Sequence, residues 1–289
     1  MNERSMSERL LPYLRLVRAP AVFSALGDPL AGMLIGRGRL PAGRAVAIGI
    51  ASAATYLAGM ALNDLADREE DARDRPQRPI PSGAVSGEQA AALGAALLGV
   101  GLGVAVATGA RRTGPALAAA VLAYDFGLKS TPAGPAAMGA CRALSLLSGA
   151  EAAGGLGAVR RAAPAAALLG AYVAGLTVLA RGETGENGNQ TAIPGVVVAG
   201  VALLAAVGRG GARALPWGIA VAALAGPAAM RSVREPSGGA TGAAVGAMIR
   251  VIPALDAALA APSAPLAAAL IATPLLALAR WGRRLIPIS

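Results

Sequence analysis

The chain has 289 residues, of which 55% are hydrophobic and 15% are charged, and its mean hydropathy is +0.57. An ordinary soluble domain is less apolar than this, so the composition predicts a membrane protein. Much of the apolar content is alanine, which contributes little to membrane insertion, and a soluble alanine-rich helical protein is therefore the alternative.

The charged residues limit the classes of partner. The formal net charge is +10, yet the basic residues are arginines scattered along the chain, apart from the single Lys129, and no basic face alternates with aromatic side chains. We therefore expect no nucleic-acid partner and favour anionic lipid headgroups or a diphosphate. One cysteine, Cys141, and no histidine exclude a disulfide framework, a cysteine-based metal site and the usual zinc ligands. A metal ion would have to be held by oxygen atoms.

Residues 1–19 mix four arginines with leucine and valine. The charges run up to the first apolar span, and they do not precede a separate apolar core. The segment therefore predicts an amphipathic helix at the membrane interface and not a cleaved signal peptide.

Ten apolar segments follow, each close to the ~20 residues that cross about 30 Å of hydrocarbon. They cover residues 20–37, 43–62, 89–109, 114–128, 134–153, 163–180, 192–208, 214–230, 241–260 and 264–281. The pattern predicts an all-α, polytopic membrane helical bundle with nine or ten spans, and no β structure. Residues 1–289 are expected to form a single domain.

The distribution of charge between the spans predicts the orientation. With a cytoplasmic N-terminus, the loops after the second, fourth, sixth and eighth spans lie on the cytoplasmic face, and these loops hold almost every acidic residue outside the spans. Ten spans place more arginine on that face than nine do, and the positive-inside rule favours the larger number. We expect a multi-pass protein of the inner (plasma) membrane with both termini and the acidic loops in the cytoplasm.

The densest charge lies in residues 63–83, NDLADREEDARDRPQRPIPSG, directly after the second apolar span. Asp64, Asp67 and Asp71 are spaced i, i+3 and i+7, so a helix continuing from that span would place the three carboxylates on one face, with Asn63 beside Asp67. Carboxylates packed so closely need a cation, and oxygen ligands of this kind suit Mg²⁺. The alternative is a solvated loop in which the arginines of the segment pair with its acids.

A second group of ionisable residues lies near the end of the fourth span and inside the fifth: Tyr124, Asp125, Lys129 and Arg142. Charged groups in a bilayer are costly and are candidates for function. Lys129 would bind a substrate or anchor a helix end at the interface. Arg142 needs an anion, which a diphosphate would provide, as would Asp125 or Glu151 in a structural pair.

These segments resemble the UbiA superfamily of intramembrane prenyltransferases. NDLADREED, starting at Asn63, matches the NDxxDxxxD signature, RPQRPIPSG resembles the continuation of that motif, and residues 124–129 with the following MGxxR resemble the family's second helical motif. The resemblance extends over nearly the whole chain and is closest to the EboC-like branch, whose acceptors are uncharacterised.

The resemblance implies about nine core helices around a lipid-open cavity, with the segment 264–281 outside that core. It also implies Mg²⁺-dependent transfer of an isoprenyl group from its diphosphate to a small acceptor. The catalytic residues would be Asp64, Asp67 and Lys129, and Arg142 would join Lys129 in binding the diphosphate. The metal ligands would be Asp64, Asp67 and Asp71.

The family's second aspartate-rich motif is altered here. The corresponding residues read RGETGE, so Glu183 and Glu186 are the candidate ligands for a second Mg²⁺, or that site is lost. Ser145 stands where related sequences carry asparagine. Without histidine, Glu183 or Asp125 would accept the acceptor's proton, which favours a small cyclic alcohol or phenol.

Ionisation of an allylic diphosphate leaves a carbocation that needs a dry, electron-rich pocket. Tyr56, Tyr124 and Tyr172 lie on the second, fourth and sixth spans, whose ends meet on the acidic face, and Tyr56 shares a helical face with Asn63 and Asp67. We expect these tyrosines and Asn63 to bind substrate. The alternative is that the tyrosines are packing residues.

Two other functional classes compete with this interpretation. One is a non-enzymatic membrane transporter or scaffold whose acidic loop binds a cation. The other is a CDP-alcohol phosphotransferase, but its DGxxAR and GxxxDxxxD signatures are absent from the sequence.

Overall fold

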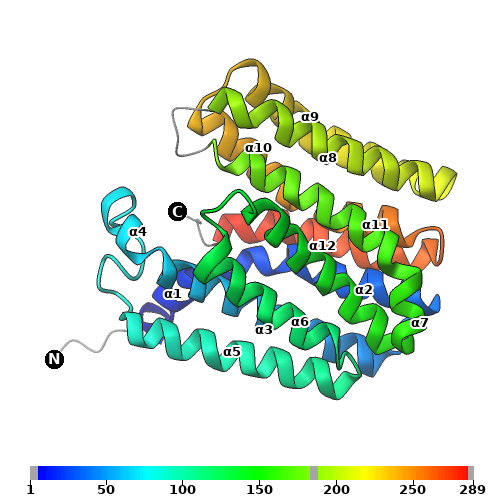
Figure 1. The fold of residues 1–289 in the computed structure, drawn as a ribbon, viewed down its shortest axis with the longest axis horizontal. Coiled ribbons are helices and arrows are strands. Elements are labelled where there is room, and N and C mark those ends of the chain that lie inside the picture. Colours follow the sequence, from blue (N-terminus) through cyan, green and yellow to red (C-terminus); the bar gives the residue numbers. More distant parts are fainter. Residues whose placement is uncertain (1–5, 183–187, 286–289) are drawn as a thin grey trace.

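A computed structural model describes residues 6–182 and 188–285, and these residues form helices joined by turns, with no strand among them (Figure 1). In chain order the helices are α1 (Met6–Leu16), α2 (Phe23–Arg37), α3 (Ala42–Ala66), α4 (Arg68–Asp74), α5 (Gly87–Thr108), α6 (Thr113–Ala123), α7 (Gly134–Ala180), α8 (Gly188–Gly210), α9 (Leu215–Arg234), α10 (Gly238–Arg250), α11 (Ile252–Ala260) and α12 (Pro265–Leu285). Three short helical turns, η1 (Ala19–Val22), η2 (Tyr124–Leu128) and η3 (Gly211–Arg213), join some of them. The predicted all-α class is confirmed.

Six helical segments are long and apolar enough to cross a membrane: Ala19–Arg37, Ala42–Ala66, Gly87–Thr108, Gly134–Ala180, Gln190–Arg213 and Gly238–Ala260. Two shorter apolar segments are Thr113–Leu128 and Pro265–Ala279. Each of the ten predicted apolar ranges falls on helix, and the protein is a multi-pass membrane protein. The number of core helices remains a prediction.

Helix α7 contains two of the predicted spans, and the chain reverses direction between them. Gly154 and Gly155 have non-helical backbone angles inside it, and Gly155 has a φ of 63° and a ψ of −156°. The two halves then pack closely, since a Cβ atom on Gly139 would lie 2.4 Å from the carbonyl oxygen of Gly170. The glycine pair therefore makes the turn between two antiparallel helices.

Glycines also set the contact between α2 and the first half of α7. A Cβ atom on Gly32 would lie 1.9 Å from the Leu146 carbonyl oxygen, and one on Gly149 would lie 1.8 Å from the Pro29 carbonyl oxygen. Side chains are excluded from this contact, so the two backbones touch. Small residues provide this close packing in lipid, where hydrophobic burial does not drive helices together. The high glycine and alanine content thus follows from helix packing.

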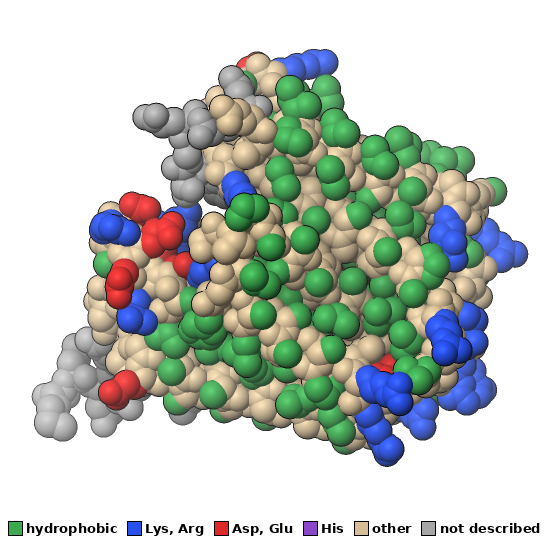
Figure 2. All heavy atoms as spheres, viewed as in Figure 1, with side chains coloured by type: hydrophobic (Ala, Val, Ile, Leu, Met, Phe, Trp, Pro, Cys, Tyr) green, Lys and Arg blue, Asp and Glu red, His purple; other side chains and the backbone are tan. Residues whose placement is uncertain are grey.

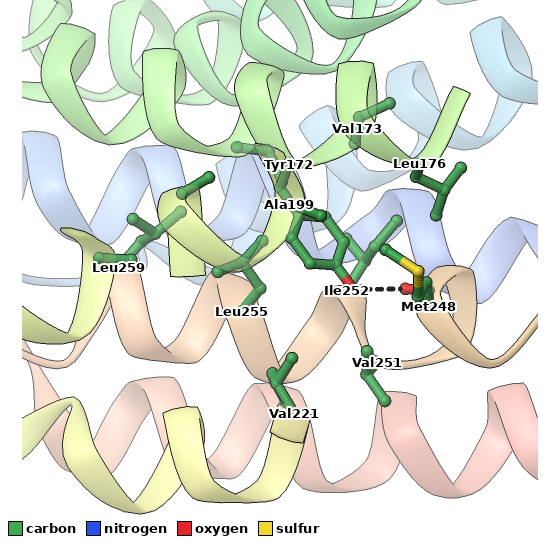
Figure 3. Close-up of a cluster of buried hydrophobic side chains, with 14 of the residues drawn as sticks. Tyr172, Val173, Leu176, Ala199, Val221, Met248, Val251, Ile252, Leu255 and Leu259 are labelled. Carbon is green, nitrogen blue, oxygen red and sulfur yellow. Dashed lines mark hydrogen bonds between the residues drawn. The ribbon is translucent and has the colours of Figure 1, made fainter. Parts of the chain in front are cut away.

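The largest buried cluster joins α7 to α8, α9, α10 and α11 (Figure 3). Tyr172 is 2% exposed within it, and its hydroxyl donates to the carbonyl oxygen of Met248 at 3.2 Å. The outer surface is also apolar, with Leu204, Leu266 and Leu270 among its most exposed side chains. Figure 2 shows hydrophobic side chains over the middle of one face and charged ones at its two ends, as a lipid-embedded surface requires.

Helix α1 lies at the end of the bundle that carries α4 (Figure 1). Leu10, Leu11 and Leu14 are exposed on it, whereas Leu16 and the following Val17 are buried against α3 and α5 residues. An exposed leucine row beside a packed face is compatible with the predicted interfacial helix over the described part of residues 1–19.

Candidate functional site

The three aspartates of the acidic segment do not share one helical face. Helix α3 ends at Ala66, and Asp67 has a φ of −89° and a ψ of 4° as the junction between α3 and α4. The predicted continuous helix is therefore wrong at this residue. The break leaves Asp64 and Asp71 next to one another and turns Asp67 away from them, toward Lys129.

Asp64 and Asp71 are joined by Arg78. Its Nη1 lies 2.7 Å from Asp71 Oδ2 and 3.4 Å from Asp64 Oδ1, and Arg18 Nη2 lies 2.8 Å from the same Asp64 oxygen. Asp64 is 4% and Asp71 is 1% exposed. The pairing of arginines with acids that the alternative interpretation predicts is thus present. It is buried, however, so the expected solvated loop is wrong for Asp64 and Asp71.

Arg18 is a site residue that sequence reasoning assigned only to the interfacial helix. Its φ of 47° and ψ of 49° are left-handed, and it is the one residue other than glycine with a positive φ in the described chain. Such a conformation is costly and marks positions that the surrounding structure or function demands. Its position directly before Ala19 and Pro20, at the start of the first span, was the available signal in the sequence.

Lys129 follows η2 and contacts Asp67, on the side away from Asp64 and Asp71. Its Nζ lies 2.5 Å from Asp67 Oδ1 and 3.4 Å from the carbonyl oxygen of Asn63. Arg181, at the end of α7, donates to the carbonyl oxygens of Lys129 and Thr131 and so ties this turn to the next pair of helices. Lys129 is therefore held within the site, which goes beyond anchoring a helix end.

Asn63 and Asp125 form the inner side of the site. Asn63 Nδ2 donates to Asp125 Oδ1 at 3.2 Å. Asp125 is 4% exposed, and its buried Oδ2 has no hydrogen-bond partner among residues 6–182 and 188–285. An acceptor atom of this kind is available to a ligand that brings a donor.

A cavity of about 1250 Å³ opens between these residues and the ends of α7 and α10. Its charged lining, together with Asn63, comprises Arg18, Asp67, Arg68, Glu70, Arg75, Arg78, Asp125, Lys129, Arg181 and Arg250. The excess of cationic side chains suits an anionic ligand, and the acidic residues at its rim suit a cation.

A second, inner pocket of about 220 Å³ lies between α3, α6 and the first half of α7. Most of its lining is apolar or small: Ala25, Thr55, Gly59, Met60, Leu117, Val121, Met138 and Cys141. The two spaces share part of their walls, namely Arg18, Tyr56, Asn63, Tyr124 and Asp125. An apolar group in the inner pocket would therefore adjoin a charged group in the cavity.

Arg142 differs from its predicted position. It lines the inner pocket, does not line the large cavity, and donates through Nη2 to Asp28 Oδ1 at 2.8 Å and to the Ser24 carbonyl oxygen at 2.6 Å. The partner is thus Asp28, and neither Asp125 nor Glu151. Glu151 instead accepts from the Thr113 hydroxyl and from backbone N–H groups at the start of α6.

The remaining predicted residues divide into three groups. Tyr56 and Tyr124 line both spaces, and Ser145 lines the inner pocket. Tyr172 is a core residue that lines neither, because its ring fills the cluster between α7 and α11 and its hydroxyl is bonded there. Glu183 and Glu186 lie outside the described residues.

The oxygen atoms of the site are of the kind that binds a divalent cation. Their arrangement fits such an ion only in part. Carboxylate oxygens without histidine or thiolate suit Mg²⁺. Within the described ranges, however, no three acidic side chains converge on one point. Arg18 and Arg78 hold Asp64, Arg78 also holds Asp71, and Lys129 holds Asp67, so each candidate ligand is already neutralised by a basic side chain.

These features define a class: polytopic helical membrane proteins with a charged cavity at one end of the bundle and an apolar pocket beside it. The sequence model of the UbiA prenyltransferase family matches residues 29–182, a little over half of the chain. The chain belongs to the UbiA prenyltransferase family.

Similar curated proteins carry the name digeranylgeranylglyceryl phosphate synthase. The chain is 40% identical over 122 residues to the one from Ignicoccus hospitalis, an alignment that covers 42% of this chain and 39% of that protein. It is 37% identical over 122 residues to the one from Methanopyrus kandleri, covering 42% of this chain and 45% of that protein. The matched segment thus spans less than half the length of either relative.

Two solved structures share the fold. A UbiA homologue from Aeropyrum pernix K1, in its apo form, has a TM-score of 0.68 at 20% identity, covering 81% of this chain and 96% of that one. A structure reported for the biosynthesis of digeranylgeranylglyceryl phosphate synthase in membranes has a TM-score of 0.62 at 19% identity, covering 89% of this chain and 99% of that one. At this identity they support the fold alone, and the EboC-like assignment remains a prediction.

Proposed function

We propose that the protein transfers an isoprenyl group from an allylic isoprenyl diphosphate to a small acceptor within the membrane. The observation that carries this proposal is the shared wall between a cation-rich cavity and an apolar pocket. A diphosphate in the cavity would place the carbon–oxygen bond that breaks at this wall, within reach of an acceptor in the apolar pocket.

The diphosphate is expected in the large cavity, bound by Lys129, Arg18 and Arg78. Guanidinium and ammonium groups form charge-assisted hydrogen bonds to phosphate oxygens, which are stronger than neutral ones. In the structure these three residues neutralise the aspartates. A diphosphate would draw the cationic groups toward itself and free carboxylate oxygens for a metal ion.

Asp64, Asp67 and Asp71 are the residues proposed to hold that ion, with Mg²⁺ favoured by their oxygen donors, and Glu183 and Glu186 are proposed for a second one. When bound, the ion would neutralise charge on the leaving diphosphate. Lys129 contributes to the same neutralisation from the chain itself, and Asp67 positions Lys129 through their 2.5 Å ion pair.

In the proposed reaction the bond between the allylic carbon and the diphosphate oxygen breaks, and its electron pair leaves with the diphosphate. Tyr56 and Tyr124, on the shared wall, offer ring faces to the carbocation. The acceptor's nucleophilic atom supplies the electron pair for the new bond. Its proton passes to Asp125 Oδ2, which is buried and unpartnered among the described residues.

The names of the relatives suggest a glycerophosphate acceptor, whereas the residues of this site favour a small cyclic alcohol or phenol, because its proton is lost easily to a single carboxylate once its oxygen has attacked the carbocation. We propose that the reaction takes place in the inner (plasma) membrane, with the charged cavity facing the cytoplasm. The exposed leucines described above support the embedding in lipid, and the distribution of charge in the loops supports the orientation.

The experiment is to reconstitute the purified protein in nanodiscs with Mg²⁺, supply labelled isoprenyl diphosphates of graded chain length with native lipid extract, and analyse the extracted products. We expect a prenylated lipid product and release of diphosphate. Lys129→Gln should lose most of this activity, whereas Glu88→Gln, an exposed carboxylate on α5, should not. Wild-type protein that binds no isoprenyl diphosphate would instead favour a transporter or scaffold.

A further inference from the structure

Three buried ionisable side chains from separate helices meet behind the inner pocket: Asp28 on α2, Arg142 on α7 and Asp256 on α11. Asp28 is 0%, Asp256 3% and Arg142 9% exposed. Charged groups at such depth in a membrane protein are costly and are retained where they serve a purpose. None of the steps proposed above uses this trio.

The trio has one strong internal contact and several unused atoms. Arg142 Nη2 lies 2.8 Å from Asp28 Oδ1. With both acids ionised, Arg142 Nε, Asp28 Oδ2 and both carboxyl oxygens of Asp256 have no hydrogen-bond partner within the described chain. Asp256 also abuts the backbone of α2, since a Cβ atom on Gly27 would lie 2.2 Å from its Oδ2.

The Asp28 and Asp256 carboxyl groups are neighbours, because Asp256 packs against Gly27, the residue next to Asp28. Two carboxyl groups buried side by side with a single guanidinium cannot both be ionised, so they would share one proton. One proton and one guanidinium then balance two acids. The trio has no net charge.

Arg142 belongs to the wall of the inner pocket, and the hydrogen bonds described above all come from its Nη2, so the guanidinium has further N–H groups without an acceptor among the described residues. A buried donor left without an acceptor carries the full cost of its desolvation, so an oxygen atom of a ligand in the pocket would relieve that cost. The remaining wall is mainly apolar. The pocket therefore presents one fixed hydrogen-bond donor on an otherwise apolar surface.

The volume of the pocket sets the size of such a ligand. An apolar cavity of about 150 Å³ accommodates benzene, which has six non-hydrogen atoms, or roughly 25 Å³ for each atom. At that density the 220 Å³ of the inner pocket holds about nine non-hydrogen atoms.

We propose that the inner pocket binds a neutral small molecule of about this size, with an apolar body and one oxygen that accepts a hydrogen bond from the Arg142 guanidinium. An anion is disfavoured, because the trio offers no net positive charge to offset the desolvation of a second negative group. The walls shared with the large cavity would make this molecule the prenyl acceptor. That last step rests on the proposed function, whereas binding to the pocket does not.

Three probes with nine non-hydrogen atoms each test this proposal: acetophenone, cumene and benzoate. Their binding is measured by equilibrium dialysis against protein in nanodiscs, with empty nanodiscs subtracted, and without Mg²⁺ or isoprenyl diphosphate. We expect saturable binding of acetophenone, at least about tenfold weaker binding of cumene, which lacks the oxygen, and no saturable binding of benzoate.

Arg142→Lys is the matched variant. Lysine lacks the guanidinium N–H groups proposed to bind the ligand oxygen, while its ammonium group retains a positive charge beside Asp28. We expect acetophenone to bind about tenfold more weakly to this variant and cumene to bind unchanged. Asp256→Asn removes one carboxyl group together with the proton that it shares, so Asp28 and Arg142 still balance. The variant should therefore keep the preference for acetophenone over cumene and benzoate.

Several outcomes overturn the proposal. Equal affinity of the wild type for cumene and acetophenone would make the pocket a site for an apolar chain only. Saturable binding of benzoate would mean that the trio carries positive charge. Unchanged acetophenone binding in Arg142→Lys, or no acetophenone binding in the wild type, would place the recognition elsewhere. The dialysis contains neither isoprenyl diphosphate nor Mg²⁺. Its result therefore does not depend on whether prenyl transfer is detected.

Discussion

Arg78 lies within hydrogen-bonding distance of Asp71, with Nη1 2.7 Å from Oδ2, although the two residues sit on opposite sides of the turn that follows α4. The same nitrogen also contacts Asp64, so one guanidinium replaces a metal ion between two carboxylates. Both aspartates are nearly completely buried. The cation that compact acidic residues require is thus supplied by the chain itself.

Replacing Arg78 with glutamine should therefore have two opposite effects. We expect the free energy of unfolding to fall by about 3 kcal/mol, because breaking the buried ion pair leaves the Asp71 carboxylate with only a 3.7 Å contact to Arg75. The affinity for Mn²⁺, measured by electron paramagnetic resonance without diphosphate, should rise because Asp64 and Asp71 become available.

Arg73→Gln is the matched control, since Arg73 is exposed on α4. It should change neither the unfolding transition nor Mn²⁺ binding. Weaker or unchanged Mn²⁺ binding in Arg78→Gln would show that the guanidinium does not compete with a metal ion for these carboxylates.

Asp67→Asn and Asp71→Ala should separate the role of Asp67, which lines the cavity, from that of the buried Asp71. Asp67 faces the cavity and pairs with Lys129, so its loss should lower the rate of diphosphate release by at least about 100-fold with little change in stability. Asp71 is 1% exposed and holds Arg78, so Asp71→Ala should lower stability more than Asp67→Asn does and lower activity less.

Rates of diphosphate release and thermal unfolding of both variants check this division, with Asp74→Asn on the exposed face of α4 as the control. Full activity of Asp67→Asn would remove Asp67 from the proposed catalytic group.

The helices were largely predictable because the hydrophobic segments are long and are separated by glycine, proline and charged residues. The reversal inside α7 was located because Gly154 and Gly155 follow a full span and precede charged residues. The break at Asp67 was not predictable from spacing. The residues around it continue a good helical pattern, and Lys129, 62 positions along the chain, holds its side chain outside that pattern.

The candidate site was predicted where its residues adjoin in sequence and missed where they converge from a distance. Arg18 and Asp28 reach the site from the first helices and have no local motif. Tyr172 has the same sequence spacing to Glu183 as Tyr56 has to Asp67, but the second half of α7 packs Tyr172 into the core. Helical spacing fixes a face, and tertiary packing decides what that face contacts.

Gly155→Ala tests the reversal in α7. The glycine has a φ of 63° and a ψ of −156°, a conformation that residues with a side chain strongly disfavour, although a Cβ atom at this position would meet no neighbouring atom within 4 Å. We expect the free energy of unfolding to fall by about 1–3 kcal/mol from backbone strain alone.

Gly157→Ala, two residues further along the same helix, should leave stability unchanged or raise it slightly, since alanine is favoured over glycine in a helix. Chemical unfolding of both variants in detergent checks the difference. Equal stability of the two would mean that the turn tolerates side chains and that the halves of α7 are held by their glycine contacts alone.

Asp125→Asn tests the proposed proton acceptor, because the amide keeps the shape of the side chain but does not take up a proton. If Asp125 accepts the acceptor's proton, prenyl transfer should fall by about 100-fold or more. Ionisation of the diphosphate does not need that proton transfer, so diphosphate should still be released and the isoprenyl group captured by water. The measurement is the ratio of isoprenyl alcohol to transferred product, and it should rise strongly in the variant. Asn63→Ala, which removes the hydrogen bond to Asp125 Oδ1 but leaves the carboxylate, should change this ratio far less. A parallel fall in both products would instead assign Asp125 to the ionisation step or to the structure of the site.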